Sequence, residues 1–161
     1  GNVADYAGVN LFGKVFPQGY VNIGVGGSKF SDWLNWIDGA SGMASPKKIV
    51  LNLGYNDIHS NTEPATVYKN YTEMVEKLRK CFGSPEIYLV QVVHSPKYPE
   101  MYKEECDFNN MTASTASTLG VKLIDWNDKI VASKQDCFHF DRIHPNEHGY
   151  ALFEQAIKEA L

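Results

Sequence analysis

The sequence lacks the features that mark a membrane protein, a disulfide-stapled scaffold or a nucleic-acid binder. No run of about eighteen apolar residues occurs in its 161 residues, so a membrane span is not expected. Cysteine is scarce, and three widely spaced residues fit neither a disulfide framework nor a zinc ribbon. Lysine and arginine number 15 against 19 acidic residues, so a basic face for a nucleic acid is not expected either. The remaining profile, 43% hydrophobic, is that of a globular enzyme or small-molecule binder.

Short apolar runs alternate with helical patterns along the chain. Four runs predict buried strands: residues 21–25, 48–53, 87–93 and 121–125. Helical periodicity follows each of them: from Ser31 or Asp32 to 37, over 64–82 and 101–119, and from about 145 to the carboxyl terminus. Strands that are apolar throughout and separated by helices indicate a parallel sheet covered on both faces. We therefore expect a single domain over residues 1–161, of the α/β class, with a three-layer α/β/α sandwich.

The amino-terminal part of this pattern is incomplete. Residues 4–16 have the apolar spacing of a helix, yet no strand precedes them. In a doubly wound sheet the first strand is usually central, and its omission exposes two strand edges. Either the chain begins late or another segment fills that position. A homodimer in which a partner covers the exposed edges is one prediction.

Three polar clusters follow the predicted strands or precede the last helix. They read Gly-Val-Gly-Gly-Ser at residues 24–28, Gly-Tyr-Asn-Asp at 54–57 and Asp-Arg-Ile-His-Pro at 141–145. In sheets of this kind, reactive sites lie in the crevice beyond the carboxyl ends of the strands. We therefore expect the clusters to meet at one edge of the sheet.

The third cluster carries the most specific chemistry. Asp141 stands three residues before His144, and Pro145 ends the loop, so the carboxylate can accept a hydrogen bond from the imidazole Nδ1–H. Such a bond sets the tautomer and leaves Nε2 to act as a general base. The alternative is a helix cap, in which Asp141 only satisfies backbone N–H donors.

The other two clusters supply donors that such a base requires. A tetrahedral intermediate of acyl transfer carries a negative oxygen, which preorganised N–H groups stabilise. Gly27 can present its backbone N–H without a side chain in the way, and Asn56 can add an amide donor. Tyr55 could line the pocket, and Ser28 could bind substrate or cap the following helix. The alternatives are a tight strand-to-helix turn at the glycines and a plain loop turn at residues 56–57.

Together the three clusters resemble one family, the SGNH hydrolases, also called GDSL-type esterases and lipases. Residues 22–27 are similar to its second block, 54–57 to its third and 141–145 to its fifth, in matching order and spacing. The resemblance implies a flavodoxin-like parallel sheet, with Gly27 and Asn56 as oxyanion-hole donors and Asp141 and His144 as the acid and base of a Ser-His-Asp triad. It implies hydrolysis of small acyl esters, such as an acetylated carbohydrate or a short-chain lipid-like ester.

The chain departs from this family at the first block. That block, Gly-Asp-Ser-Leu or a variant, ends the first strand and carries the nucleophilic serine. Residues 1–3 read Gly-Asn-Val instead, and we expect that the chain begins after the block, because the missing strand and the missing serine are then explained together. Ser28 and Ser95 are weaker substitutes for the nucleophile. The alternative function is a non-catalytic SGNH-like binding domain that lacks it.

Other chemistries receive less support from the sequence. His144 and His148 match the H-x-x-E-H pattern of a zinc protease, but Pro145 favours the first helical position and leaves His144 outside the helix. Cys137 and His139 are too close in sequence for a thiol–imidazole hydrogen bond. His59 and His94 could line the pocket, although solvent-facing loop histidines are the favoured interpretation. No metal or organic cofactor is expected, and the expected partner is a small-molecule ester.

Overall fold

The computed structural model describes residues 15–16, 19–40, 42 and 45–161. The strands are β1 Lys48–Leu51, β2 Glu86–Val90 and β3 Val121–Ile124. The α-helices are α2 Phe30–Trp36, α3 Tyr55–His59, α4 Pro64–Phe82, α5 Tyr102–Leu119, α6 Trp126–Ala132 and α7 Glu147–Ala160. Two short 3₁₀ helices, η2 Ile37–Ala40 and η3 Pro99–Met101, complete the described elements.

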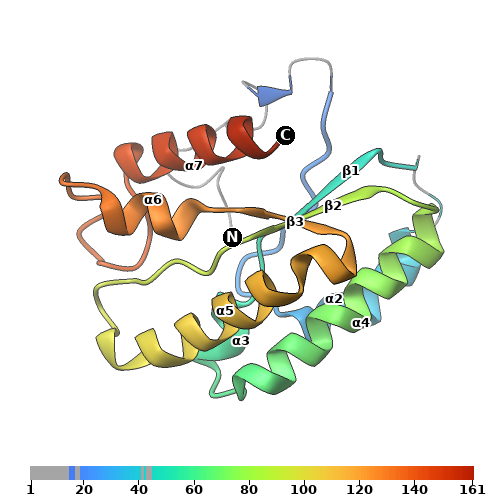
Figure 1. The fold of residues 1–161 in the computed structure, drawn as a ribbon, viewed down its shortest axis with the longest axis horizontal. Coiled ribbons are helices and arrows are strands. Elements are labelled where there is room, and N and C mark those ends of the chain that lie inside the picture. Colours follow the sequence, from blue (N-terminus) through green and yellow to red (C-terminus); the bar gives the residue numbers. More distant parts are fainter. Residues whose placement is uncertain (1–14, 17–18, 41, 43–44) are drawn as a thin grey trace.

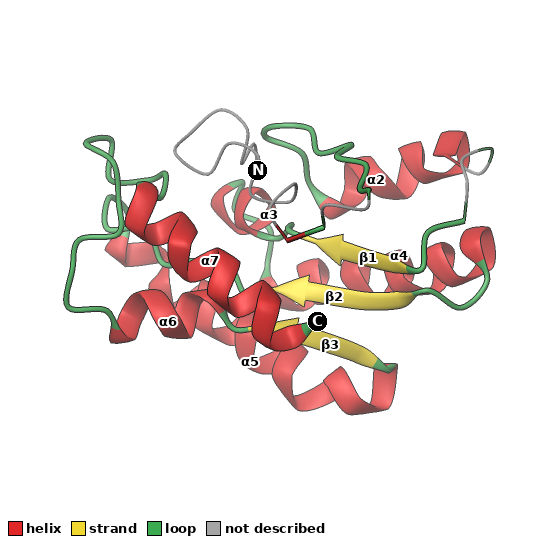
Figure 2. Ribbon diagram, turned by 90° about the horizontal axis from the view of Figure 1, so that it is seen from above, coloured by secondary structure: helices red, strands yellow, loops and turns green. Residues whose placement is uncertain are grey.

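The three strands form an open parallel sheet in the order β1-β2-β3. In Figure 2 the three arrows lie side by side and point the same way. The register places Leu51 of β1 beside Leu89 of β2, and Val90 of β2 beside Ile124 of β3. Three of the four predicted strands are therefore confirmed, together with the α/β class and the parallel sheet.

Helices cover both faces of this sheet, which gives the three layers (Figure 1). Ile87 and Leu89 pack with residues of α2, α3, α4 and α5, whereas Tyr88 and Val90 pack with residues of α6 and α7. Alternate side chains of β2 thus enter two separate cores, as successive residues of a strand must. All four are at most 1% exposed, which explains why β2 appears in the sequence as an unbroken apolar run.

The periodic helices agree with their patterns. The buried residues of α4 are Val67, Tyr71, Met74, Val75 and Leu78, a stripe at spacings of three and four. α5 ends where Gly120 adopts the left-handed conformation, with φ of 66°. None of the described helices is both long and apolar enough to cross a membrane.

The predicted strand at residues 21–25 is wrong. The segment is an irregular loop, and Val21 is 72% exposed instead of buried. Asn22 accepts a hydrogen bond from the Gly24 N–H at 2.9 Å, and the Ser28 N–H donates to the Val25 carbonyl at 3.2 Å. These local turns occupy backbone groups that a strand would need for its ladder. Among the described residues, no strand pairs with this segment.

The other differences concern short elements and one cap. The sequence does not predict α3 and α6, since Tyr55 and Ile58 in the first and Trp126 and Ile130 in the second are single pairs at helical spacing, too few to show periodicity. α2 begins at Phe30, so neither Ser31 nor Asp32 is its N-cap; the buried Asp57 instead accepts the Phe30 N–H at 3.1 Å. Burial raises the pKa of Asp57 although this backbone bond opposes the rise. The predicted helix over 4–16 lies outside the described residues except for its last two.

Gly54 joins β1 to α3 in a conformation that excludes other residues. Its φ is 112°, and a Cβ there would lie 2.9 Å from Phe108 Cε1 and 3.0 Å from Val92 Cγ2. Both neighbours belong to the packed core, so they cannot move away cheaply. We expect Gly54→Ala to lower the free energy of unfolding by about 2–4 kcal/mol, measured by urea denaturation. Gly83→Ala, also at positive φ but with open space around it, is the matched control and separates backbone strain from the clash.

Candidate active site

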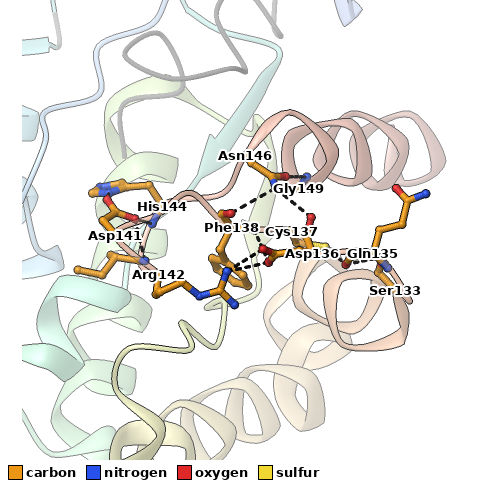
Figure 3. Close-up of polar contacts among 11 residues, drawn as sticks. Ser133, Gln135, Asp136, Cys137, Phe138, Asp141, Arg142, His144, Asn146 and Gly149 are labelled. Carbon is orange, nitrogen blue, oxygen red and sulfur yellow. Dashed lines mark hydrogen bonds and ion pairs between the residues drawn. The ribbon is translucent and has the colours of Figure 1, made fainter.

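The loop between α6 and α7 is held in shape by its own polar groups (Figure 3). The Arg142 guanidinium donates to both oxygens of Asp136, at 2.9 and 2.8 Å, and lowers the pKa of that carboxyl. Asn146 caps α7 by accepting the Gly149 N–H at 3.0 Å, and its amide donates to the Asp136 carbonyl at 2.9 Å. The His139 N–H donates to the His144 carbonyl at 2.8 Å. The loop therefore presents residues 141–144 in one defined conformation.

Asp141 and His144 form a short hydrogen bond within this loop, as Figure 3 shows. Asp141 Oδ2 lies 2.6 Å from His144 Nδ1, and Asp141 Oδ1 accepts the backbone N–H groups of Ile143 and His144 at 2.9 and 3.0 Å. Burial alone would raise the pKa of Asp141, but these three hydrogen bonds outweigh it and hold the pKa at about 2. An ionised Asp141 accepts the Nδ1–H, so Nε2 is the basic nitrogen of the ring. The imidazole side chain is 43% exposed and reachable by a substrate.

Residues 54–57 place two polar side chains at the start of α3. The Asn56 amide donates to the Ser28 carbonyl at 3.2 Å, which orients one of its two N–H groups and leaves the second as a further donor. The Tyr55 hydroxyl lies 2.7 Å from Ser95 Oγ. Burial is the main reason that the pKa of Tyr55 rises to about 12, and the negative charge of Asp141 adds to it. Tyr55 is thus a neutral hydrogen-bonding group at neutral pH.

Residues 25–28 form a tight turn ahead of α2. Gly27 has φ of 77°, a left-handed conformation that favours glycine, and nothing lies within 4 Å of where its Cβ would be. Its N–H can therefore be approached closely by a ligand. The Ser28 side chain is less suited to the substrate contact that the sequence predicts. Its hydroxyl is buried, donates to the Val25 carbonyl at 2.7 Å and accepts from the Trp33 indole at 3.0 Å.

Contacts between the clusters show which of them the fold brings together. The Asn56–Ser28 hydrogen bond joins the second cluster to the first. The Lys97 N–H donates to the Arg142 carbonyl at 3.1 Å, which joins the third cluster to the loop after β2. The Tyr55 hydroxyl, 2.7 Å from Ser95 Oγ, joins the second cluster to the same loop. A base, an amide donor and an approachable backbone N–H thus lie at the carboxyl-end edge of the sheet. Such an arrangement can deprotonate a nucleophile and stabilise a negative oxygen.

Neither serine that the sequence offers as a substitute nucleophile is well placed for attack. The Ser28 hydroxyl is committed to the bonds just described, and Ser95 is fully buried beside the Tyr55 hydroxyl. The two histidines of the zinc-protease pattern have different partners: His148 Nε2 lies 2.9 Å from Ser133 Oγ, whereas His144 faces Asp141. No group of three or more histidine, cysteine or acidic side chains in the described part of the chain is arranged to hold a metal ion.

Sequence reasoning missed one cluster next to this site. Glu105, in the first turn of α5, is fully buried and contacts His59 and His94 at 3.0 and 2.7 Å. The two histidines are therefore not solvent-facing loop residues, contrary to the favoured interpretation. A signal was available, because Glu105 lies three residues before the buried Phe108 and seven before the buried Thr112, on the buried stripe of α5.

Comparisons with solved structures give the same fold at low sequence identity. A member of the lipolytic protein G-D-S-L family from Veillonella parvula DSM 2008 has a TM-score of 0.77 and 20% identity, over 88% of this chain and 79% of that one. The acetylxylan esterase Axe2 of Geobacillus stearothermophilus has a TM-score of 0.74 and 15% identity, over 94% and 77%. The psychrotrophic esterase EstA of a Pseudoalteromonas species has a TM-score of 0.73 and 16% identity, over 98% and 86%.

Sequence comparison identifies the family directly. No curated protein sequence matches the chain. The family model described as GDSL-like Lipase/Acylhydrolase, however, matches residues 2–152, nearly the whole length. The chain therefore belongs to the GDSL-like lipase/acylhydrolase family, whose members are carboxylic ester hydrolases.

Proposed function

We propose that this protein is a serine esterase that hydrolyses small acyl esters, with His144 as the general base and Asp141 as its acidic partner. The observation that carries the proposal is the 2.6 Å bond between Asp141 Oδ2 and His144 Nδ1, on a ring that remains reachable from solvent. A carboxylate in this position stabilises the imidazolium that forms when Nε2 takes a proton. A helix cap alone would not need the imidazole, since Asn146 already caps α7.

In the proposed reaction a serine hydroxyl attacks the ester carbonyl while His144 Nε2 takes its proton. The carbonyl oxygen becomes negative, and the Gly27 N–H and the Asn56 amide donate to it. His144 then protonates the departing alcohol, and water repeats the sequence to release the acid. The resemblance assigns the serine to the family's first block, ahead of residues 22–27. The reaction needs no metal and no organic cofactor.

The proposed substrates are an acetylated carbohydrate or a short-chain lipid-like ester. The acetylxylan esterase among the similar structures supports the first, and the family's esterases and lipases support both. Tyr55 would contribute to the pocket as a neutral donor, because its pKa of about 12 keeps the phenol protonated. We expect acetyl esters to be cleaved faster than esters with eight-carbon acyl chains.

The second candidate function is a binding domain of the same fold without turnover. The engaged hydroxyls of Ser28 and Ser95 favour it, because neither of these two serines is poised for attack. Labelling with a fluorophosphonate ester, followed by peptide mapping, distinguishes the two. The esterase predicts one serine adduct that disappears in His144→Ala. A folded protein that forms no adduct would show that residues 1–161 hold no working nucleophile, which favours the binding domain for this chain.

A further inference from the structure

A second chain of ionisable groups lies beside the proposed active site and takes no part in the esterase reaction. It consists of Cys106, His94, Glu105 and His59, which we call the Glu105 cluster. Cys106 Sγ lies 3.3 Å from His94 Nε2, and His94 Nδ1 lies 2.7 Å from Glu105 Oε2. The other carboxylate oxygen, Oε1, lies 3.0 Å from His59 Nε2. A thiol, an imidazole and a carboxylate are thus connected, one after the other, by these contacts.

The burial of Glu105 determines how the protons are arranged. Its side chain is 0% exposed, and an isolated carboxylate there would be very costly unless it accepts hydrogen bonds or faces a positive charge. His94 meets that need by donating its Nδ1–H, which leaves Nε2 as the nitrogen that faces the thiol. When Nε2 takes the thiol proton, the imidazolium becomes the counter-charge that the buried carboxylate lacks. The carboxylate therefore favours the transfer of a proton from Cys106 to His94.

The cluster is held rigidly, whereas its thiol is open to solvent. The His94 backbone N–H donates to Asn127 Oδ1 at 2.8 Å, and the imidazole stacks on Tyr102 with ring centroids 4.8 Å apart. His94 is only 14% exposed, so its ring cannot turn away easily. Cys106 is an exposed residue of α5. This combination of a fixed base and an accessible sulfur is the signature of an activated nucleophile.

We propose that Cys106 is a nucleophilic thiol, activated by His94 and Glu105, that is modified by small soft carbon electrophiles such as α-halo amides. The Cys106 proton moves to His94 Nε2, and the sulfur attacks the electrophilic carbon. A C–S bond forms as the carbon–halogen bond breaks and halide leaves; His94 then passes the proton to water. The proposal does not depend on the esterase function, because His144 and Asp141 take no part in it.

The other cysteines serve as internal references for a test. Cys137 is buried and its Sγ contacts the Gln135 carbonyl at 3.4 Å, whereas Cys81 is half-buried in the last turns of α4. Exposure alone would make Cys106 the fastest of the three, so the test must separate exposure from activation. Alkylation at pH 9, where most thiols are ionised, measures the effect of exposure. At pH 6.5 about 1% of an ordinary thiol is ionised. The factor by which the Cys106 to Cys81 rate ratio at pH 6.5 exceeds the ratio at pH 9 therefore measures activation, and we call this factor the pH 6.5 excess.

The experiment is alkylation of the native protein with iodoacetamide, with rates for each cysteine taken from peptide mass spectra. We expect the Cys106 to Cys81 rate ratio at pH 6.5 to exceed the ratio at pH 9 by about ten-fold. Besides Cys106, the titratable groups that face His94 or Glu105 among the described residues are His59 and Tyr102, with Tyr98 and Tyr55 against His59. The negative charge of Glu105 also raises the pKa of Tyr55, after the larger effect of burial. The protein in concentrated urea, where all three cysteines should react alike, is the control for intrinsic reactivity.

Variants then test whether the pH 6.5 excess at Cys106 arises from the Glu105 cluster. His94→Asn should abolish it, and the near-isosteric Glu105→Gln should reduce it by at least about three-fold, because the imidazolium loses its counter-charge. His59→Asn, which changes the same carboxylate but not the thiol's own base, should retain most of it. Each variant is compared only after its thermal unfolding confirms a folded protein. Equal ratios at the two pH values, or an unchanged excess in His94→Asn, would overturn the proposal.

Discussion

Replacing His144 by alanine is expected to lower kcat/KM for a small acyl ester by about 10⁴-fold or more, because the serine would lose the base that is proposed to take its proton. His144 is partly exposed and belongs to a loop rather than to either core, so its removal should affect folding little. The measurement is initial-rate hydrolysis of p-nitrophenyl acetate by the purified protein and the variant, with unfolding curves for both.

His148 provides the matched control for this prediction. It lies four residues along the chain and bonds to Ser133 instead of Asp141. His148→Ala should therefore keep activity within about two-fold of the parent, as expected for a residue outside the reaction. An equal loss in both variants would favour a shared role for the two histidines, such as metal binding. Full activity in His144→Ala would remove it as the base.

Sequence reasoning succeeded where one local rule determines the outcome. α4 and β2 are long or uniformly buried elements, so the helical stripe and the apolar run each leave a direct pattern. The Asp141–His144 pair is also local, because residues three apart in a tight loop can meet without help from the rest of the fold. In these cases the contacts that stabilise the feature lie close together in sequence or on one face.

Sequence reasoning failed where residues distant in the sequence determine the local structure. Residues 21–25 have the composition of a buried strand, but a strand needs a neighbouring strand, and here local turn bonds take its place. The Asn56–Ser28 bond and the bonds of the Glu105 cluster join residues 11 to 46 positions apart, on different elements. No periodicity reports such contacts. The one sequence signal for the Glu105 cluster is a charged residue, Glu105, on the buried stripe of α5.

Asp141→Asn should lower kcat by about 10⁴-fold while leaving the fold intact, since asparagine keeps the size of the side chain but favours the wrong imidazole tautomer. The amide oxygen can still accept the Ile143 and His144 N–H bonds that shape the loop. The effect should therefore appear in kcat far more than in KM, measured with the same ester. A carboxylate that merely capped the loop would leave kcat unchanged.

The same variant should reveal the low pKa of Asp141 in the pH dependence of stability. The carboxyl has a pKa of about 2 in the folded protein against an ordinary value of 3.8, so the folded state binds its proton more weakly than the unfolded state. The resulting stabilisation is complete above pH 3.8 and is lost as the pH falls towards 2. Because the side chain is 30% exposed, solvent screening limits the contribution to about 1 kcal/mol.

The free energies of unfolding of the parent protein and of Asp141→Asn, measured in urea, should therefore differ by about that amount at pH 6 and converge near pH 2. Curves that stay parallel over this range would mean that the Asp141–His144 bond does not stabilise the fold, and the base would then lack its proposed anchor.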